Sequence, residues 1–406
     1  MHLLDSKCVE TLFYYLAVVQ IAVGVYLLWD AVRWMSFARR RLRGDPGFHM
    51  PRAAVLCPCK GMEPELERNL AALTQFDYKN YSVFFVLASA SDPAYATVKR
   101  IAEESHTPAH VIIAEKPEDC GEKVNNLRVA VGQLAPEFEV LVFVDSDGRP
   151  EKSWLRRMVA PLHSNSRVGA TTTMRWFIAS RNNLATRLLA AWNASVVTML
   201  KENGKNFCWG GGTAIRRDVF DQTGVLEEWS HSVSDDYSMT RALERANRSI
   251  VFVPECLIAS YAETDLRGLL EFTNRQILIT RVYSGRTWAY AALTHSLYCF
   301  TLALGAFLTL SNVMATLPAF HLAILTFVPM LLAAIRGGLR VLVATEVLPF
   351  ARGQIMNQAG SYILLAGIVP YLFLLNFAAS MLTRKLRWRG VTYELISPQQ
   401  TRILAH

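Results

Sequence analysis

The chain has 406 residues, enough for two or more ordinary domains and a sizeable buried core. Hydrophobic residues make up 52% and charged residues 19%, which excludes a disordered chain, a collagen and a small disulfide scaffold. The net charge of +8 accompanies a positive mean hydropathy of +0.20, so we expect an integral membrane protein and no nucleic-acid partner.

The first apolar stretch runs from about Leu12 to Leu28 and reaches its first charge at Asp30. It is just long enough to span about 30 Å of hydrocarbon. A cleaved signal peptide is the alternative, but no basic region precedes the stretch and no small-residue cleavage site follows it. We therefore expect a transmembrane anchor over residues 1–32. A basic cluster follows it, made of Arg33, Arg39, Arg40, Arg41 and Arg43.

The positive-inside rule places this basic cluster, and the domain after it, in the cytosol. The seven cysteines agree, because their number is odd and their spacing shows no disulfide framework. Residues 50–266 alternate short apolar runs with helical patterns, which predicts an α/β domain with a mostly parallel sheet. Strands are expected at Ala53–Cys57, Tyr81–Leu87, His110–Ala114 and Val140–Val144, and helices at about 64–75, 93–104 and 122–133.

The C-terminal third is apolar again. Residues 267–288 form an amphipathic segment, which lies in the membrane interface or packs as an ordinary helix on the domain. Residues 289–383 form a transmembrane region with three spanning candidates: Ala289–Leu310, about Ala315–Ala334, and Ser361–Leu382. The shorter piece Gly337–Phe350 carries two charges and is expected to be interfacial or re-entrant, or to cross the membrane with the help of its neighbours; a further alternative is that one of the three candidates does not cross. The basic tail, 384–406, is expected in the cytosol, which requires an even number of crossings after the α/β domain.

Carboxylates follow the last of the predicted strands. Asp145 and Asp147 stand two residues apart just past an apolar run, where they can hold a hard divalent cation, Mn²⁺ or Mg²⁺, beside a diphosphate. The alternative is an ordinary turn, because Asp-Ser-Asp-Gly is also loop chemistry.

Other polar residues also have two interpretations. Asp235 and Asp236 begin a helical pattern, so they either favour the helix dipole or supply a general base at Asp236. Asp92 is a helix cap or a ligand to a nucleotide base. Lys123 contacts phosphate or only decorates a helix start. Gly210, Gly211 and Gly212, after Trp209, permit close backbone approach to a ligand or form a simple loop.

In this order and spacing, the motifs resemble those of the inverting nucleotide-sugar transferases of glycosyltransferase family 2, and more narrowly the ceramide glucosyltransferases. The resemblance covers nearly the whole chain. Its motifs are Pro58-Cys59-Lys60-Gly61, Asn69-Leu70, Phe76-Asp77-Tyr78, Asp92-Pro93, Lys123-Val124-Asn125-Asn126-Leu127, Asp145-Ser146, Arg216–Asp221, Asp235-Asp236-Tyr237 and Trp388–Leu395.

The resemblance implies a GT-A fold and a membrane enzyme that moves a hexose, first of all glucose, from a UDP-sugar to the primary hydroxyl of a lipid, first of all ceramide. It implies that Asp236 is the general base, with Asp235 beside it, and that Asp147 and Asp145 hold Mn²⁺ or Mg²⁺. Asp92, Lys123, Asp145 and Lys60 would bind the nucleotide sugar, and Arg275, Gln276, Arg281 and Trp209 would lie at the acceptor.

Two family motifs depart from the pattern. Where the family has Glu-Asp, this chain has Asp235-Asp236, which keeps the second position, the one that carries the base. Where the family has (Gln/Arg)-x-x-Arg-Trp, this chain reads Arg275-Gln276-Ile277-Leu278-Ile279, without the second Arg and the Trp. Arg281 and Trp288 are candidates to replace them. The loss argues against a processive polysaccharide synthase. It leaves open another acceptor, such as diacylglycerol or a hopanoid, and a non-catalytic relative that binds lipid or nucleotide.

Overall fold

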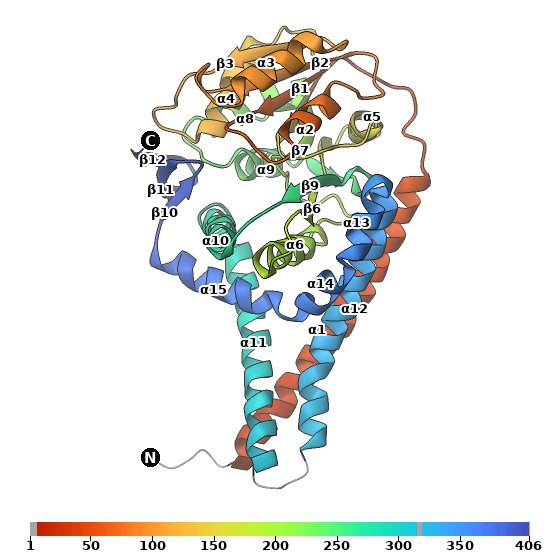
Figure 1. The fold of residues 1–406 in the computed structure, drawn as a ribbon, viewed down its shortest axis with the longest axis vertical. Helices are drawn as coiled ribbons and strands as arrows, with labels where there is room; N and C mark the ends of the chain where they lie inside the picture. Colours follow the sequence, from red (N-terminus) through yellow and green to blue (C-terminus); the bar gives the residue numbers. More distant parts are fainter. Residues whose placement is uncertain (1–5, 315–318, 406) are drawn as a thin grey trace.

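The computed structural model describes residues 6–314 and 319–405 of the chain. Figure 1 shows an α/β domain at one end of the molecule and long helices that extend from it to the other end. The helices α1, α11 and α12 form this extension, whereas α10 and α15 lie between it and the domain.

A seven-stranded sheet forms the centre of the α/β domain. All neighbouring strands run parallel except around β7, which is antiparallel to both of its partners. The expected α/β fold with a mostly parallel sheet is therefore confirmed. In spatial order the strands are β3 (Ala109–Ile113), β2 (Tyr81–Leu87), β1 (Ala53–Pro58), β4 (Val140–Val144), β7 (Gly212–Arg216), β5 (Val168–Thr172) and β8 (Ser249–Phe252).

Helices cover both faces of the sheet, which is why central strands such as β4 read as unbroken apolar runs. Val55 and Val142 face the core shared with α2 and α3, whereas Leu56 and Phe143 face the core shared with α4 and α9. The helices of the domain are α2 (Leu66–Leu73), α3 (Tyr95–Glu104), α4 (Glu122–Gln133), α5 (Trp154–Val159), α6 (Leu184–Val197), α7 (Arg217–Gln222), α8 (Val225–Glu228) and α9 (Asp235–Arg245). The predicted strands and helices of this domain match the observed ones to within two residues at each end.

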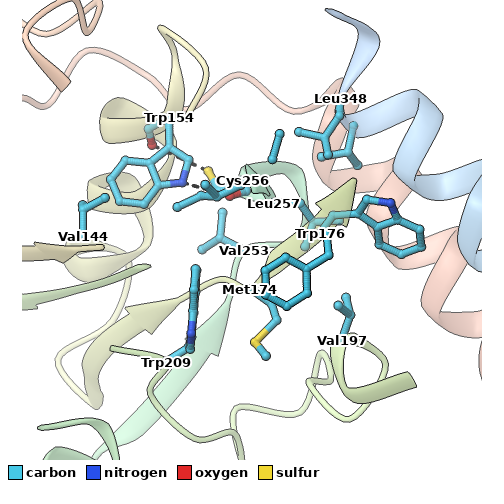
Figure 2. Close-up of a cluster of buried hydrophobic side chains, with 14 of the residues drawn as sticks. Val144, Trp154, Met174, Trp176, Val197, Trp209, Val253, Cys256, Leu257 and Leu348 are labelled. Carbon is cyan, nitrogen blue, oxygen red and sulfur yellow. Dashed lines mark hydrogen bonds between the residues drawn. The ribbon is translucent and has the colours of Figure 1, made fainter. Parts of the chain in front are cut away.

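A second, two-stranded sheet lies between the domain and the helices below it. It pairs β6 (Arg175–Ala179) with β9 (Ile258–Ala262) in parallel. Figure 2 shows Trp176 of β6 beside Leu348, at the end of α12, and Trp154 on the opposite side of the same core. The Trp154 indole donates to the carbonyl of Cys256 at 2.9 Å. One continuous apolar core thus joins the α/β domain to the long helices.

Within the described residues, three helices are long and apolar enough to cross a membrane. They are α1 (Ser6–Arg43), α11 (Gly285–Met314) and α12 (Phe320–Val347). Residues 1–5 of the expected anchor and 315–318 of the expected second span lie outside the described residues. The helix α11 leads away from the α/β domain and α12 returns to it (Figure 1).

The interpretation of Gly337–Phe350 as a separate piece between two spans was wrong. Residues 337–347 are the last turns of α12, not a separate interfacial piece. Gly337 and Gly338 lie inside α12 and do not end it. A side chain at Gly337 would collide with the backbone of Tyr362, so this glycine allows α12 to pack closely against the helix that carries Tyr362. Glu346 does not disfavour the helix either, because it pairs with Arg39 of α1 at 2.5 Å.

The third candidate, Ser361–Leu382, is not one straight helix. It divides into α14 (Ala359–Leu364) and α15 (Val369–Leu382), which are joined by a short 3₁₀ turn and bent by 60°. The short α13 (Arg352–Asn357) precedes them. After α15 the chain forms a three-stranded antiparallel sheet beside the α/β domain, with β10 (Lys385–Trp388), β11 (Val391–Ser397) and β12 (Gln400–Ala405).

Candidate active site

The acidic pair after β4 lies where a parallel sheet normally binds its ligands, at the carboxyl ends of the strands. Asp145 contacts two cations: its carboxylate lies 2.8 Å from Lys123 Nζ and 2.6 Å from Arg175 Nη2. Arg175 also binds Asp147 at 2.5 Å. Burial alone would raise the pKa of Asp145, but the charges of Lys123 and Arg175 lower it to about 2.

Arg175 is a site residue that the sequence analysis missed. It begins β6 and bridges the two carboxylates of the acidic pair. Its guanidinium also lies over the ring of Trp209, 4.9 Å from the ring centre, and its carbonyl accepts from Asn193 of α6. No local motif marks it, because strand β6 lies outside the main sheet and meets the acidic pair only through the tertiary fold.

Lys123 joins the acidic pair to the second carboxylate cluster. It lies in the first turn of α4 and contacts Asp145, Asp235 at 3.2 Å, and the carbonyl of Gly210 at 3.2 Å. Burial alone would lower the pKa of Lys123, but the two carboxylates hold it above its usual range. The structure thus brings together three residues that the sequence singled out separately.

Asp235 and Asp236 begin α9, as expected. The hydroxyl of Ser234 caps the helix by accepting from the amide of Tyr237, and it also donates to the Asp236 carboxylate. The other oxygen of Asp236 accepts from the amide of Gly210 at 3.4 Å. Helix capping is therefore real here, yet Asp236 also faces the space that the acidic pair faces.

The two carboxylates of α9 differ in environment. The side chain of Asp235 is only 5% exposed. Burial, and then the charges of Asp236 and Asp145, raise its pKa to about 6 despite the nearby Lys123 ammonium. Asp235 therefore serves as a buried partner of Lys123, whereas Asp236 lies beside it without such a cation among its hydrogen-bond partners in the described residues.

The glycine loop after Trp209 fits closely against these charges. A side chain at Gly210 would collide with the Asp235 carboxylate and lie 2.8 Å from Lys123 Nζ. A side chain at Gly211 would lie 2.5 Å from Asp145 Oδ2. The glycines thus allow the backbone of this loop to approach closely, as the sequence suggested. What the backbone approaches is the charged side chains of Asp145, Asp235 and Lys123.

A cavity of about 1180 Å³ connects this charged centre with the long helices. Its walls include the acidic pair, Lys123, Trp209 and both aspartates of α9 at one end, and residues of α1, α6, α11 and α12 at the other. Lys60 also lines it and pairs with Glu122 at 2.6 Å. A charged centre and an apolar chamber between membrane-type helices are therefore one continuous space.

Asp92 does not line this cavity. Its carboxylate accepts from the amides of Gly61 and Ala94, both at 2.8 Å. Asp92 therefore ties the loop after β1 to the loop after β2 and begins the turn before α3. This position supports the loop that carries Lys60.

The amphipathic segment forms α10 (Leu266–Tyr283), capped by Asp265, and packs against the domain and α15. Arg275 and Gln276 line the cavity. The Arg275 guanidinium lies between the rings of Phe272 and Trp388, at 5.2 and 5.1 Å. Burial and the nearby charge of Arg389 lower its pKa to about 10.

Arg281 and Trp288 do not take the places of the missing motif residues. Arg281 donates to the carbonyls of Ser380 and Thr383 at the end of α15, and the Trp288 indole donates to the Ser380 hydroxyl at 3.0 Å. Neither residue lines the cavity. The tryptophan that does line it beside Arg275 is Trp388, which comes from the C-terminal sheet.

The acidic pair also fits a divalent cation. In the described parts of the chain, no group of three or more His, Cys, Asp or Glu side chains is arranged to hold one by itself. However, Asp147 Oδ1 is buried and has no hydrogen-bond partner among the described residues. Mg²⁺ and similar hard cations are commonly held by one or two carboxylates, with substrate phosphates and water supplying the other ligands. Asp145 and Asp147 suit such a site.

Comparison with known proteins agrees with the sequence resemblance. The family model described as glycosyl transferase family 21 matches residues 12–401. A curated relative, ceramide glucosyltransferase 1 of Caenorhabditis elegans, is 20% identical over 226 residues, which are 54% of this chain and 47% of the relative. The match thus spans about half the length of that relative.

Two solved structures are similar at low identity. A mannosyltransferase from Pyrobaculum calidifontis, in complex with GDP-Man and Mn²⁺, is 18% identical with a TM-score of 0.45, covering 88% of this chain and 98% of that one. A glucosyl-3-phosphoglycerate synthase from Mycobacterium tuberculosis, in complex with Mn²⁺, UDP and glucosyl-3-phosphoglycerate, is 16% identical with a TM-score of 0.38, covering 58% and 80%. The family match covers nearly the whole chain, and the chain belongs to glycosyl transferase family 21, a family of sugar-transferring enzymes.

Proposed function

We propose that this glycosyltransferase moves a hexose, glucose before other sugars, from a UDP-sugar to the primary hydroxyl of a membrane lipid, with ceramide the first choice. The observation that carries the proposal is the single cavity that joins the carboxylate centre to the long apolar helices. A polar donor and a lipid acceptor need such a space, because one requires charged contacts and the other an apolar chamber. The name of the curated relative supports ceramide.

In the proposed mechanism, Asp236 takes the proton from the lipid hydroxyl as the oxygen attacks the sugar carbon, in one displacement with inversion. Asp235 stays paired with Lys123 and fixes the start of α9 beside it. Lys123, with Lys60, contacts the phosphates, and Asp92 positions the loop of Lys60.

Asp147 and Asp145 would hold Mn²⁺ or Mg²⁺ at the diphosphate, and the cation would stabilise the charge of the leaving group. Arg175 now bridges the same two carboxylates. It offsets their negative charge in the buried centre. Arg175 binds Asp147 through Oδ2, and the other oxygen, Oδ1, has no hydrogen-bond partner in the described residues.

We further propose the membrane arrangement. Residues 1–32 anchor the chain, 50–266 form the cytosolic transferase domain, 267–288 lie at the interface, and 289–383 return through the membrane before the cytosolic tail 384–406. The basic end of α1 supports this orientation. The path of α11 and α12 supports it too, because an outward and a return helix bring the tail back to the domain (Figure 1).

A different lipid is the second candidate acceptor, and diacylglycerol or a hopanoid is the first alternative. The observation that favours it is the altered motif on α10. Leu278 and Ile279 are 3% and 7% exposed and pack among apolar side chains. Ile279 lines the chamber and presents apolar surface at the position of the motif Trp, whereas Leu278, at the position of the motif Arg, packs in the apolar cluster outside the chamber lining.

The test is a UDP-release assay with the purified full-length chain in detergent micelles. UDP-glucose, UDP-galactose and UDP-N-acetylglucosamine are each combined with ceramide and with diacylglycerol, with and without Mn²⁺. We expect metal-dependent release that requires one sugar and one lipid together. UDP release at the same rate without lipid would contradict a lipid acceptor. UDP release at the same rate without Mn²⁺ would contradict the role given to Asp145 and Asp147.

A further inference from the structure

Two arginines lie in the membrane-side part of the cavity and take no part in the mechanism above. Arg336 and Arg340 of α12 both line it. They are four residues apart, so they lie on the same face of the helix, about one turn from each other. Their Nε atoms are buried and have no hydrogen-bond partner in the described residues. The hydrogen bond that Arg340 makes is to the Thr198 hydroxyl, at 3.1 Å.

Nearby acids do not balance this pair. Asp30 of α1 lines the same part of the cavity, but it forms an ion pair with Lys201, which also lines it. Glu346, six residues beyond Arg340 on α12, is bound to Arg39 of α1, and neither residue lines the cavity. Like charges at this helical spacing repel, and cations in a largely apolar wall are expensive unless an anion reaches them. The chamber therefore has an excess of positive charge.

The arginines are close to the sugar-transfer centre. Helix α6 runs along the cavity from the active site to the two arginines. Asn193 donates to the carbonyl of Arg175 at 2.8 Å, and Thr198, which is bound by Arg340, follows five residues later. Five residues of helix correspond to about 7.5 Å along its axis. A ligand at the arginines is thus inside the chamber that leads to Asp236, not on the outer surface of the bundle.

We propose that Arg336 and Arg340 form a site for the anionic head group, a phosphate or a phosphodiester, of a lipid that occupies this chamber. Guanidinium groups match phosphate oxygens with paired hydrogen bonds, and both arginines line the chamber. The inference rests on the proposed function for one point, that a lipid enters the cavity. It adds that the membrane-side end of the cavity binds an anionic group. Ceramide is neutral and has no such group.

The test measures binding without any sugar transfer, so it is independent of whether the proposed reaction is correct. The full chain, purified in neutral detergent, is titrated with phosphatidylglycerol, and the rise in unfolding temperature gives the apparent dissociation constant. Parallel titrations use phosphatidylcholine and inorganic phosphate. For the wild type we expect phosphatidylglycerol to stabilise the chain at concentrations where the other two do not.

The variants are Arg336→Gln, Arg340→Gln and both together. Each single variant should bind phosphatidylglycerol about 10- to 100-fold more weakly, which corresponds to loss of one charged hydrogen bond, and the double variant should bind more weakly still. Replacing both arginines by lysine should restore part of the affinity. The matched control is Arg286→Gln, because Arg286 is an exposed arginine of α11 outside the cavity, and it should bind as the wild type does.

Stability without lipid separates ligand binding from a purely structural role. If the arginines await an anion, the glutamine variants unfold without lipid at the wild-type temperature or higher, because a repulsion is removed. If Arg340 only fixes α12 to Thr198, its glutamine variant unfolds at a lower temperature and keeps its affinity for phosphatidylglycerol. That result overturns the proposal, as does undiminished binding by the double variant. Equal stabilisation by inorganic phosphate would assign the site to the free ion and overturn the lipid.

Discussion

The charged side chains of the active site form one connected chain of contacts. It runs from Asp147 through Arg175 to Asp145, and then through Lys123 to Asp235. Each cation is shared between two carboxylates, so the buried centre keeps its charges close to balance. Asp236 lies at the end of this chain and has only hydroxyl and amide donors as partners in the described residues. That difference is why we assign the proton transfer to Asp236.

We predict that Gly211→Ala abolishes transfer. The added methyl group would lie 2.5 Å from Asp145 Oδ2 and collide with the Trp209 ring, so either the loop or the carboxylate must move. Overpacking of this kind costs about 1–3 kcal/mol of stability. UDP release and the unfolding temperature are the measurements.

Gly132→Ala is the matched control for this variant. Gly132 lies in α4 and has nothing within 4 Å of an added methyl group. Alanine there should leave activity unchanged and raise stability slightly, since glycine disfavours helices by about 1 kcal/mol. An active Gly211→Ala enzyme would show that the close approach of the glycine loop is dispensable.

Glu63 provides a test of the electrostatics by pH. Burial and the charge of Asp147 raise its pKa from 4.5 to about 7. Between these pH values the folded chain holds a proton that the unfolded chain has lost, so this group stabilises the fold at low pH and the contribution disappears as pH rises through 7. A shift of this size corresponds to about 3 kcal/mol at most.

We therefore predict that Glu63→Gln flattens the fall in stability between about pH 5 and about pH 8. The free energy of unfolding from denaturant titrations at each pH is the measurement. Asp235, whose pKa is also raised, is present in both proteins, so the difference between them reports Glu63 alone. Parallel wild-type and variant profiles would contradict the raised pKa.

At the scale of secondary-structure elements, the sequence predicted what local patterns encode. The apolar run of β4 and the acidic pair after it could be assigned together, and so could the starts of α4 and α9 with Lys123 and Asp236. Arg175 could not be predicted, because its partners are 28 and 30 residues away and the pairing exists only in the folded chain. The roles of Asp92 and Arg281 were ambiguous for a related reason. An aspartate can cap a helix or bind a ligand, and an arginine can bind backbone carbonyls or a substrate, and the sequence alone does not distinguish these roles.

The C-terminal sheet is the element that the sequence predicted least well. The tail was expected as a basic segment that carries the family motif Trp388–Leu395, with no strands predicted in it, but it folds as a sheet against the edge of the active site. Arg389 donates to the carbonyl of Lys60 at 2.6 Å and to the Glu63 carboxylate, and the amide of Glu122 donates to the Tyr393 hydroxyl. The strand alternation of β11 is visible in the sequence, yet its docking depends on these distant contacts.

We predict that Arg389→Ala releases this sheet locally. Loss of its contacts to Lys60 and Glu63 should speed amide hydrogen exchange in 391–397 by roughly tenfold or more, because a charged hydrogen bond is worth about 1.5–3 kcal/mol. Arg402→Ala is the control, since Arg402 belongs to an exposed ion pair of the same sheet and such pairs contribute little. Equal exchange in the two variants would show that the sheet is held by its apolar contacts alone.

At the scale of the whole molecule, composition indicated a membrane protein, and the alternation of apolar runs with helical patterns indicated an α/β domain; the long apolar helices agree with the first prediction. The number of helices after the domain could not be read from hydropathy. Gly337 and Glu346 resemble a break in α12, but Gly337 packs against the backbone of Tyr362 and Glu346 pairs with Arg39 in the fold. Conversely, the apolar run Ser361–Leu382 looked continuous, although it bends by 60°.

Helix α15 supplies part of the chamber wall. Together with α10 it lies between the α/β domain and the extension formed by α1, α11 and α12 (Figure 1). The cavity passes among these elements and ends at the carboxylates. The account therefore depends on one claim, that a lipid hydroxyl in this chamber loses its proton to Asp236.

Asp236→Asn tests that claim most directly, with lipid-dependent UDP release as the measurement and UDP-sugar affinity measured on the same samples. The control is Asp221→Asn, an exposed carboxylate of α7. The account predicts that Asp236→Asn lowers turnover on the order of 10²–10⁴-fold, as for loss of a general base, with UDP-sugar affinity and the control unchanged. Wild-type turnover by Asp236→Asn would contradict the account.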